Sequence, residues 1–85
     1  MIEITVTQYN KHQMTDTILD YCQCSDEINA ANWVKDSWDS ECEDMFGTNP
    51  IKIMKLAKEI EISGYVMIET PYCSDAQIIW TIIKH

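Results

Sequence analysis

The chain has 85 residues, with 14 acidic side chains, six lysines and no arginine, and its formal net charge is −8. This balance argues against direct binding to nucleic acid or to anionic membranes, because both require clustered basic residues. A chain of this length forms one small domain, and an apolar content of 46% with only two glycines and two prolines indicates a folded one. We therefore expect a single α+β domain over residues 1–85.

The N-terminal residues predict a strand. In IEITVTQY, residues 2–9, apolar and polar side chains alternate, which is typical of a half-buried strand and unlike a signal peptide. We expect a cytoplasmic protein with reduced thiols. After a polar turn at 10–13, residues 14–23 predict a short helix capped near Thr15. Their β-branched content leaves the second strand of an N-terminal hairpin as the alternative.

A longer helix is predicted to begin at Ser25. Its hydroxyl suits an N-cap, and the acids Asp26 and Glu27 suit the positive end of a helix dipole. An apolar stripe at helical spacing continues to about residue 46, and Gly47 is expected to end the helix. The stripe consists of Ala31, Val34, Trp38, Cys42 and Met45.

A second helix is expected to begin at Asn49-Pro50 and to end near Ser63-Gly64. Asparagine is a suitable cap, and proline is favoured at the first helical position. The expected core face of this helix consists of Ile53, Leu56, Ala57 and Ile60.

Two strands, residues 65–70 and 76–84, are predicted next, joined by a tight loop at 71–75. The last strand is apolar on both faces, which is typical of a central strand. One face holds Ile78, Trp80 and Ile82, and the other holds Ile79 and Ile83. The predicted order is β-α-α-α-β-β, a three-stranded antiparallel or mixed sheet with two or three helices on one face. The second sheet face must then meet a loop, a second copy of the chain or a partner.

No motif predicts a metal site, a cofactor or an active site. The cysteines form one C-x-C pair and two distant singles, whereas small zinc sites present two close pairs. The acidic block has neither the ligand spacing nor the glycine of a calcium loop. Two isolated histidines are a poor supply of bases for nucleophilic catalysis. We therefore expect a protein that is not an enzyme. The residues considered are His12, Cys22, Cys24, Cys42, Cys73 and His85.

The net negative charge is concentrated in one segment of the chain. Residues 14–46 hold nine acids and one lysine, a net −8, while acids and lysines balance in the rest of the chain. On a helix, Asp36, Asp39 and Glu43 lie opposite the apolar stripe, and like charges stacked in this way are destabilising. A solvated helix normally mixes charges of both signs. The arrangement favours a surface that meets a basic partner, with a solvated face as the alternative.

Trp33 falls away from the apolar stripe and close to acidic residues. It either packs against residues 14–23 or forms an aromatic anchor inside an acidic rim, as in many interface hot spots. The expected partner-binding residues are Asp26, Trp33, Asp36, Asp39, Glu41, Glu43 and Asp44.

In size and charge alone, the chain is similar to the small acidic inhibitors that phages deploy against host nucleases and CRISPR complexes. The composition, rich in isoleucine and without arginine, also fits a phage or mobile element. We expect an interaction protein that mimics nucleic acid and covers a basic surface of a nuclease, a restriction or CRISPR component, or a toxin. The alternative is an antitoxin-like or assembly module that uses the apolar sheet face, with a homodimer as one form.

Overall fold

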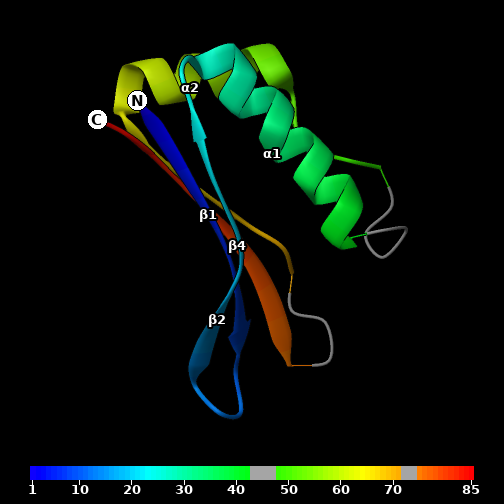
Figure 1. The fold of residues 1–85 in the computed structure, drawn as a ribbon. Helices are drawn as coiled ribbons and strands as arrows, with labels where there is room; N and C mark the ends of the chain where they lie inside the picture. The colour runs from blue at the N-terminus through cyan, green and yellow to red at the C-terminus, as the bar shows by residue number, and fades with distance from the viewer. Residues whose placement is uncertain (43–47, 72–74) are drawn as a thin grey trace.

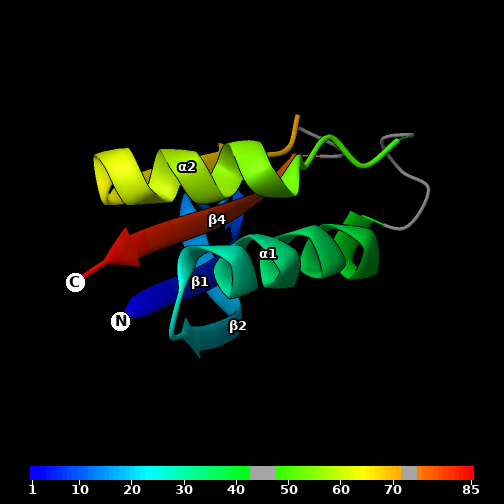
Figure 2. The same ribbon diagram turned by 90° about the horizontal axis from the view of Figure 1, so that it is seen from above.

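The structure is a computed structural model that describes residues 1–42, 48–71 and 75–85. Within these ranges the chain forms a four-stranded antiparallel sheet with two helices on one face (Figures 1 and 2). The α+β prediction is confirmed at this level. The elements are β1 (Ile2–Asn10), β2 (Thr15–Cys24), α1 (Glu27–Cys42), α2 (Ile53–Ser63), β3 (Tyr65–Glu69) and β4 (Ala76–Lys84).

The prediction of a helix at residues 14–23 is wrong, because this segment is strand β2. It pairs with β1 along its whole length, and a turn closes the hairpin where the Gln13 amide donates to Asn10 Oδ1 at 3.0 Å. The β-branched residues that weakened the helix prediction suit this strand. The described elements therefore follow the order β-β-α-α-β-β rather than β-α-α-α-β-β, with four strands instead of the expected three, while the two helices lie within the expected two or three.

The strand order is β2-β1-β4-β3, so the chain's first and last strands lie side by side at the centre. The expectation of a central last strand is confirmed. In Figure 2, α1 lies over β1 and β2, while α2 lies beside β4. The core between these layers consists mainly of Ile2, Ile4, Val6, Val34, Trp38, Leu56, Ile60, Trp80 and Ile82.

The predicted apolar stripe of α1 is buried from Ala31 to Cys42, whereas Met45 and Gly47 lie outside the described residues. The helix is capped by Asp26 rather than Ser25, because Asp26 Oδ1 accepts the Asn29 amide at 2.8 Å. Glu27 pairs with Lys84 Nζ at 2.6 Å, and this hydrogen bond lowers the pKa of the Glu27 carboxyl. The two acidic residues at the start of α1, Asp26 and Glu27, therefore both have partners within the protein.

Helix α2 begins at Ile53, so the predicted start at Asn49-Pro50 is wrong. Asn49 uses its side chain differently: Oδ1 accepts the Ile51 amide at 2.9 Å, and Nδ2 donates to the Lys35 carbonyl of α1 at 2.9 Å. This residue therefore ties the segment before α2 to α1. The predicted end is confirmed, since Gly64 has φ 69° and donates its amide to the Ile60 carbonyl at 2.9 Å.

Candidate functional site

A groove opens between α1 and β2 on the helix side of the sheet. The two elements meet at the turn through Ser25 and then diverge, as Figure 1 shows, so α1 does not cover the far part of the hairpin. The resulting hollow has a volume of about 290 Å³. We call it the acidic groove, and its lining residues are Asp20, Trp33, Asp36, Ser37, Ser40 and Glu41.

The single lining residue from β2 is Asp20. It lies opposite Val6 of β1, which is completely buried beneath the helices, and directly paired residues of a sheet point to the same face. Asp20 therefore lies on the helix side of the sheet, yet it is exposed because α1 has already turned away. Its Oδ1 accepts the backbone amide of Tyr21 at 2.8 Å, which fixes the carboxylate beside the strand.

The remaining lining residues come from one flank of α1. Trp33 is half-buried and packs against the core, so its indole presents only part of its surface to the groove. Asp36 and Ser40 are exposed, and Glu41 is half-buried. Ser37 is buried, and its Oγ accepts the Trp80 indole N–H at 2.9 Å, which holds this flank of α1 against β4.

This lining favours a positively charged side chain. Carboxylates on a concave, partly apolar surface concentrate cations, and the face of an indole attracts an ammonium or guanidinium group. The volume is at the small end of the range for ligand pockets, so it suits one side chain better than a cofactor. The groove therefore matches an arginine or lysine projecting from another protein.

The structure brings together three of the predicted partner-binding residues, Trp33, Asp36 and Glu41. Asp39 lies apart from them and accepts a hydrogen bond from Asn49 Nδ2 at 2.9 Å. Asp26 is occupied as the cap of α1, and it also accepts Asn29 Nδ2 at 2.9 Å. The remaining two predicted residues, Glu43 and Asp44, lie outside the described residues. Sequence reasoning missed Asp20, because residues 14–23 were expected to form a helix and only the pairing of Asp20 with Val6 places it on the helix side.

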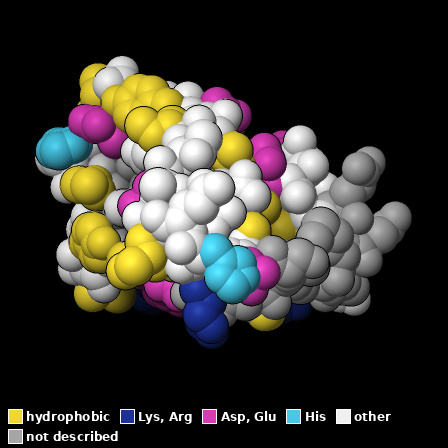
Figure 3. All heavy atoms as spheres, turned by 90° about the horizontal axis from the view of Figure 1, so that it is seen from below, with side chains coloured by type: hydrophobic (Ala, Val, Ile, Leu, Met, Phe, Trp, Pro, Cys, Tyr) yellow, Lys and Arg dark blue, Asp and Glu magenta, His cyan; other side chains and the backbone are white. Residues whose placement is uncertain are grey.

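The sheet face away from the helices, here called the open face, is a second candidate surface. Five of its apolar side chains are between 37% and 69% exposed: Ile18, Tyr21, Tyr65, Met67 and Ile83. In Figure 3, which views the molecule from the side opposite to Figure 2, the apolar side chains form separate groups with acidic and histidine side chains between them. The open face is thus apolar in composition but is not one continuous hydrophobic patch.

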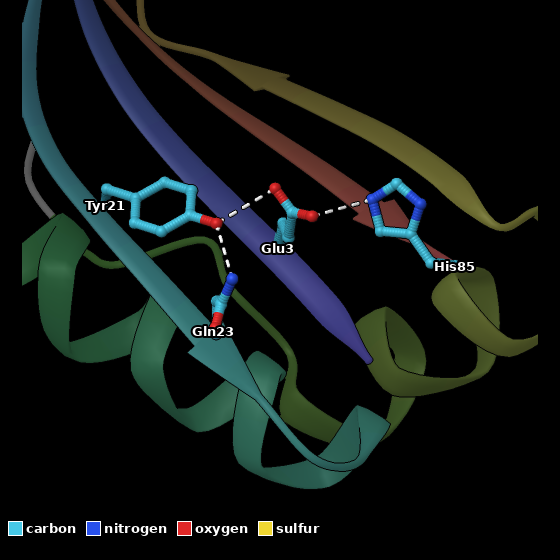
Figure 4. Close-up of polar contacts among 4 residues, drawn as sticks. All are labelled: Glu3, Tyr21, Gln23 and His85. Atoms are coloured by element: carbon cyan, nitrogen blue, oxygen red, sulfur yellow. Dashed lines mark hydrogen bonds and ion pairs between the residues drawn. The ribbon is translucent and has the colours of Figure 1, made fainter.

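A polar cluster explains one of these interruptions. Figure 4 shows Glu3 of β1 between Tyr21 and His85 on the open face. The Tyr21 hydroxyl donates to Glu3 Oε2 at 2.9 Å, His85 Nε2 lies 2.9 Å from Glu3 Oε1, and Gln23 Nε2 donates to the Tyr21 hydroxyl at 2.9 Å. The hydrogen bond from Gln23 lowers the pKa of Tyr21. Desolvation and Glu3 together raise this pKa by more than Gln23 lowers it, so the net shift is upward.

The described cysteines do not converge. Cys22 and Cys24 are neighbours on β2 and half-buried, whereas Cys42 is buried in the core beneath α1, where burial raises its pKa to about 11. Cys73 lies outside the described residues. Within the described ranges, no three histidine, cysteine or acidic side chains are grouped to hold a metal ion. Neither of the two described helices combines the length and hydrophobicity needed to cross a bilayer.

The acidic groove predicts an ion-selective quenching of Trp33 fluorescence. Trp38 and Trp80 are 5% and 0% exposed, so Trp33 is the accessible indole. Because the surrounding carboxylates attract cations and repel anions, caesium should quench Trp33 more strongly than iodide. The measurement is a Stern–Volmer titration at low ionic strength. Each slope is divided by the slope that the same ion gives with free N-acetyltryptophanamide, so that the two ions can be compared. Equal normalised slopes for the two ions would contradict an acidic environment at Trp33.

Two matched variants locate the effect. The groove variant, Asp36→Asn/Glu41→Gln, removes two charges from the groove and should bring the two slopes together. The control variant, Glu59→Gln/Glu61→Gln, removes two exposed charges from α2 and should leave the difference intact. Trp33→Phe should remove the quenchable emission in both titrations.

The geometry therefore shows one concave acidic surface and one exposed sheet face. The acidic groove combines charge, an aromatic side chain and a defined volume, whereas the open face offers scattered apolar side chains around a polar cluster. No protein-family model, curated protein or solved structure matches the chain.

Proposed function

We propose that this protein is a non-enzymatic binding protein that receives a basic side chain of a partner protein in the acidic groove. The observation that carries the proposal is the half-buried indole of Trp33 in a hollow that also includes Asp20, Asp36 and Glu41. Carboxylates attract the positive charge of an arginine or lysine, and an aromatic ring beside them contacts both that charged group and the apolar stem of the side chain.

The proposed partner surface is one that normally binds nucleic acid. Such surfaces hold rows of lysine and arginine that follow the phosphate backbone. The acids of β2 and α1 belong to a segment, residues 14–46, that carries the whole net charge of −8. A protein with this field would be drawn to the partner electrostatically and would block its nucleic-acid site. We propose an inhibitor acting in a host cytoplasm, with a nuclease, a restriction or CRISPR component, or a toxin as its target.

The experiment is a comparative capture. The immobilised full-length protein, the groove variant and the control variant are each exposed to bacterial cytoplasmic extract at low salt, and retained proteins are identified by mass spectrometry. The proposal expects a basic nucleic-acid-binding protein that binds the wild type and the control variant, is released by salt, and is absent from the groove variant. The purified partner should then lose its mobility-shift complex with nucleic acid when this protein is added.

Two results would refute the proposal. The first is a partner that the groove variant retains as well as the wild type does. The second is a partner that binds this protein and nucleic acid at the same time, since simultaneous binding excludes occlusion. The first result compares variants captured from the same extract, and the second is read from purified components, so neither depends on the absolute efficiency of the capture.

The exposed apolar residues favour a second candidate function, an antitoxin-like or assembly module that uses the open face. Ile83 is 37% exposed and Ile79 is half-buried on that face. Ile83→Asp places a charge where a dry contact would form and should abolish such an interaction, while the groove variant should leave it unchanged. Sedimentation equilibrium of the wild type and Ile83→Asp tests the homodimer form of this alternative.

A further inference from the structure

We propose that Cys22 and Cys24 form a reversible dithiol–disulfide pair within strand β2. The two residues are separated by one position, so their side chains lie on the same face of the strand. Their sulfur atoms are 3.7 Å apart, and both side chains are half-buried rather than enclosed. This pair is independent of the acidic groove and of the function proposed for it.

The surroundings allow a small oxidant to reach the pair. A hollow of about 450 Å³ lies beside Cys24 and is lined by Met1, Gln23, Cys24 and Ser25. Cys42 provides an internal contrast, because it is 2% exposed in the core and has no such access. A low-molecular-weight disulfide therefore reaches β2 more readily than it reaches the core thiol.

The backbone geometry makes closure feasible but strained. Alternate residues of a strand are about 6.6–6.8 Å apart, which is at the upper end of the Cα separations that a disulfide spans. β2 is at the edge of the sheet and pairs only with β1 among the described strands, so it can bend to shorten this separation. A strained disulfide that closes almost no loop adds little stability and is easily reduced, which is the behaviour of a regulatory bond.

The reaction is an exchange with a small disulfide such as oxidised glutathione. One protein thiolate attacks a sulfur of the small disulfide, whose S–S bond breaks and releases one small thiolate. The second protein thiolate then attacks the protein sulfur of the mixed disulfide, forms the Cys22–Cys24 bond and expels the second small thiolate. The protein loses two electrons and two protons, and the small disulfide is reduced to two thiols.

The two thiols differ in the order in which they act. Burial, with the contact to Cys22, raises the pKa of Cys24 to about 11, so Cys24 enters the reaction protonated. The first attack is therefore assigned to Cys22, which is half-buried and lies 3.7 Å from Cys24 at the hollow. Cys24 then gives its proton to the released small thiolate and makes the closing attack.

The test treats the folded full-length protein with oxidised glutathione, alkylates the remaining thiols with iodoacetamide, and maps the products by mass spectrometry. The wild type is expected to lose two alkylation sites, to retain no glutathione, and to yield a peptide in which Cys22 and Cys24 together lack two hydrogen atoms. Cys24→Ser is expected to accumulate at least tenfold more glutathione adduct than the wild type, on Cys22, because it has no closing thiol. Reduced glutathione should restore all the alkylation sites of the wild type.

A matched control moves one thiol to the other face of the strand. In Cys22→Ser/Gln23→Cys the two cysteines, 23 and 24, are adjacent in sequence. Residue 23 pairs with Glu3 and lies on the open face, whereas Cys24 lies on the helix side. This variant should therefore retain bound glutathione instead of forming an intramolecular disulfide. The proposal is overturned if the wild type accumulates stable glutathione adducts on β2, if the disulfide includes Cys42 or Cys73, or if the control variant closes as readily as the wild type.

Discussion

Trp80→Ala is expected to lower the free energy of unfolding by about 3–5 kcal/mol, a large share of the stability of an 85-residue domain. Trp80 is fully buried on the central strand β4, where its ring stacks on Trp38 with centroids 5.1 Å apart. Its indole N–H donates to Ser37 Oγ at 2.9 Å. The substitution would therefore remove the largest fully buried side chain together with its stacking and hydrogen-bond contacts to α1.

Urea denaturation followed by far-ultraviolet circular dichroism measures this loss without using tryptophan emission. Trp80→Phe keeps a ring against Trp38 and should cost less, while Ser37→Ala should cost about 1–3 kcal/mol because the indole N–H would be left without its partner. Met54→Ala, at a site 71% exposed on α2, is the matched control and should change stability by no more than about 0.5 kcal/mol. A midpoint for Trp80→Ala equal to that of the wild type would contradict this role.

The helices of this protein could be predicted from sequence because their pattern is local. The spacing from Ala31 to Cys42 places one side of α1 in the core, and each member of that stripe depends only on its neighbours in the same helix. The end of α2 at Gly64 is equally local, since a left-handed φ of 69° suits glycine. Such features need no knowledge of the rest of the fold.

Strand β2 could not be predicted in the same way, because a β-bulge hides its period of two. Asp20 pairs with Val6 and Ile18 pairs with Thr7, so Leu19 is an extra residue on β2 and the alternation breaks there. Only pairing with β1 decides that the segment is extended. The start of α2 was missed for a similar reason, since Asn49 contacts α1 instead of capping its own helix.

The same distinction explains how much of the candidate site was foreseen. Trp33, Asp36 and Glu41 share one flank of one helix, so their proximity follows from helical geometry. Asp20 joins them only because β2 lies beside α1, whereas Asp39 lies further round the helix and its side chain accepts a hydrogen bond from Asn49. The α1 side of the acidic groove therefore follows from the sequence of one helix, whereas its β2 side depends on how the chain folds.

In the proposed complex, Trp33→Ala is expected to weaken binding to the captured partner about 30-fold, the effect of losing about 2 kcal/mol at an aromatic hot spot. The indole is half-buried before binding and would be desolvated completely by a side chain entering the groove. Trp33→Phe retains an aromatic ring, which attracts a cation more weakly than an indole does, and it should therefore lose less binding affinity than Trp33→Ala. Isothermal titration of the purified partner measures both, with circular dichroism to confirm that the variants are folded.

The groove variant should change a different quantity, the salt dependence of binding. Asp36 and Glu41 act through charge, so their loss should flatten the plot of log Kd against log salt and should reduce the association rate more than it raises the dissociation rate. The control variant, Glu59→Gln/Glu61→Gln, alters the net charge equally but leaves the groove intact, and it should keep most of the wild-type slope. If the two variants flatten the plot to the same extent, the effect comes from net charge alone, and the groove is not where the basic side chain binds.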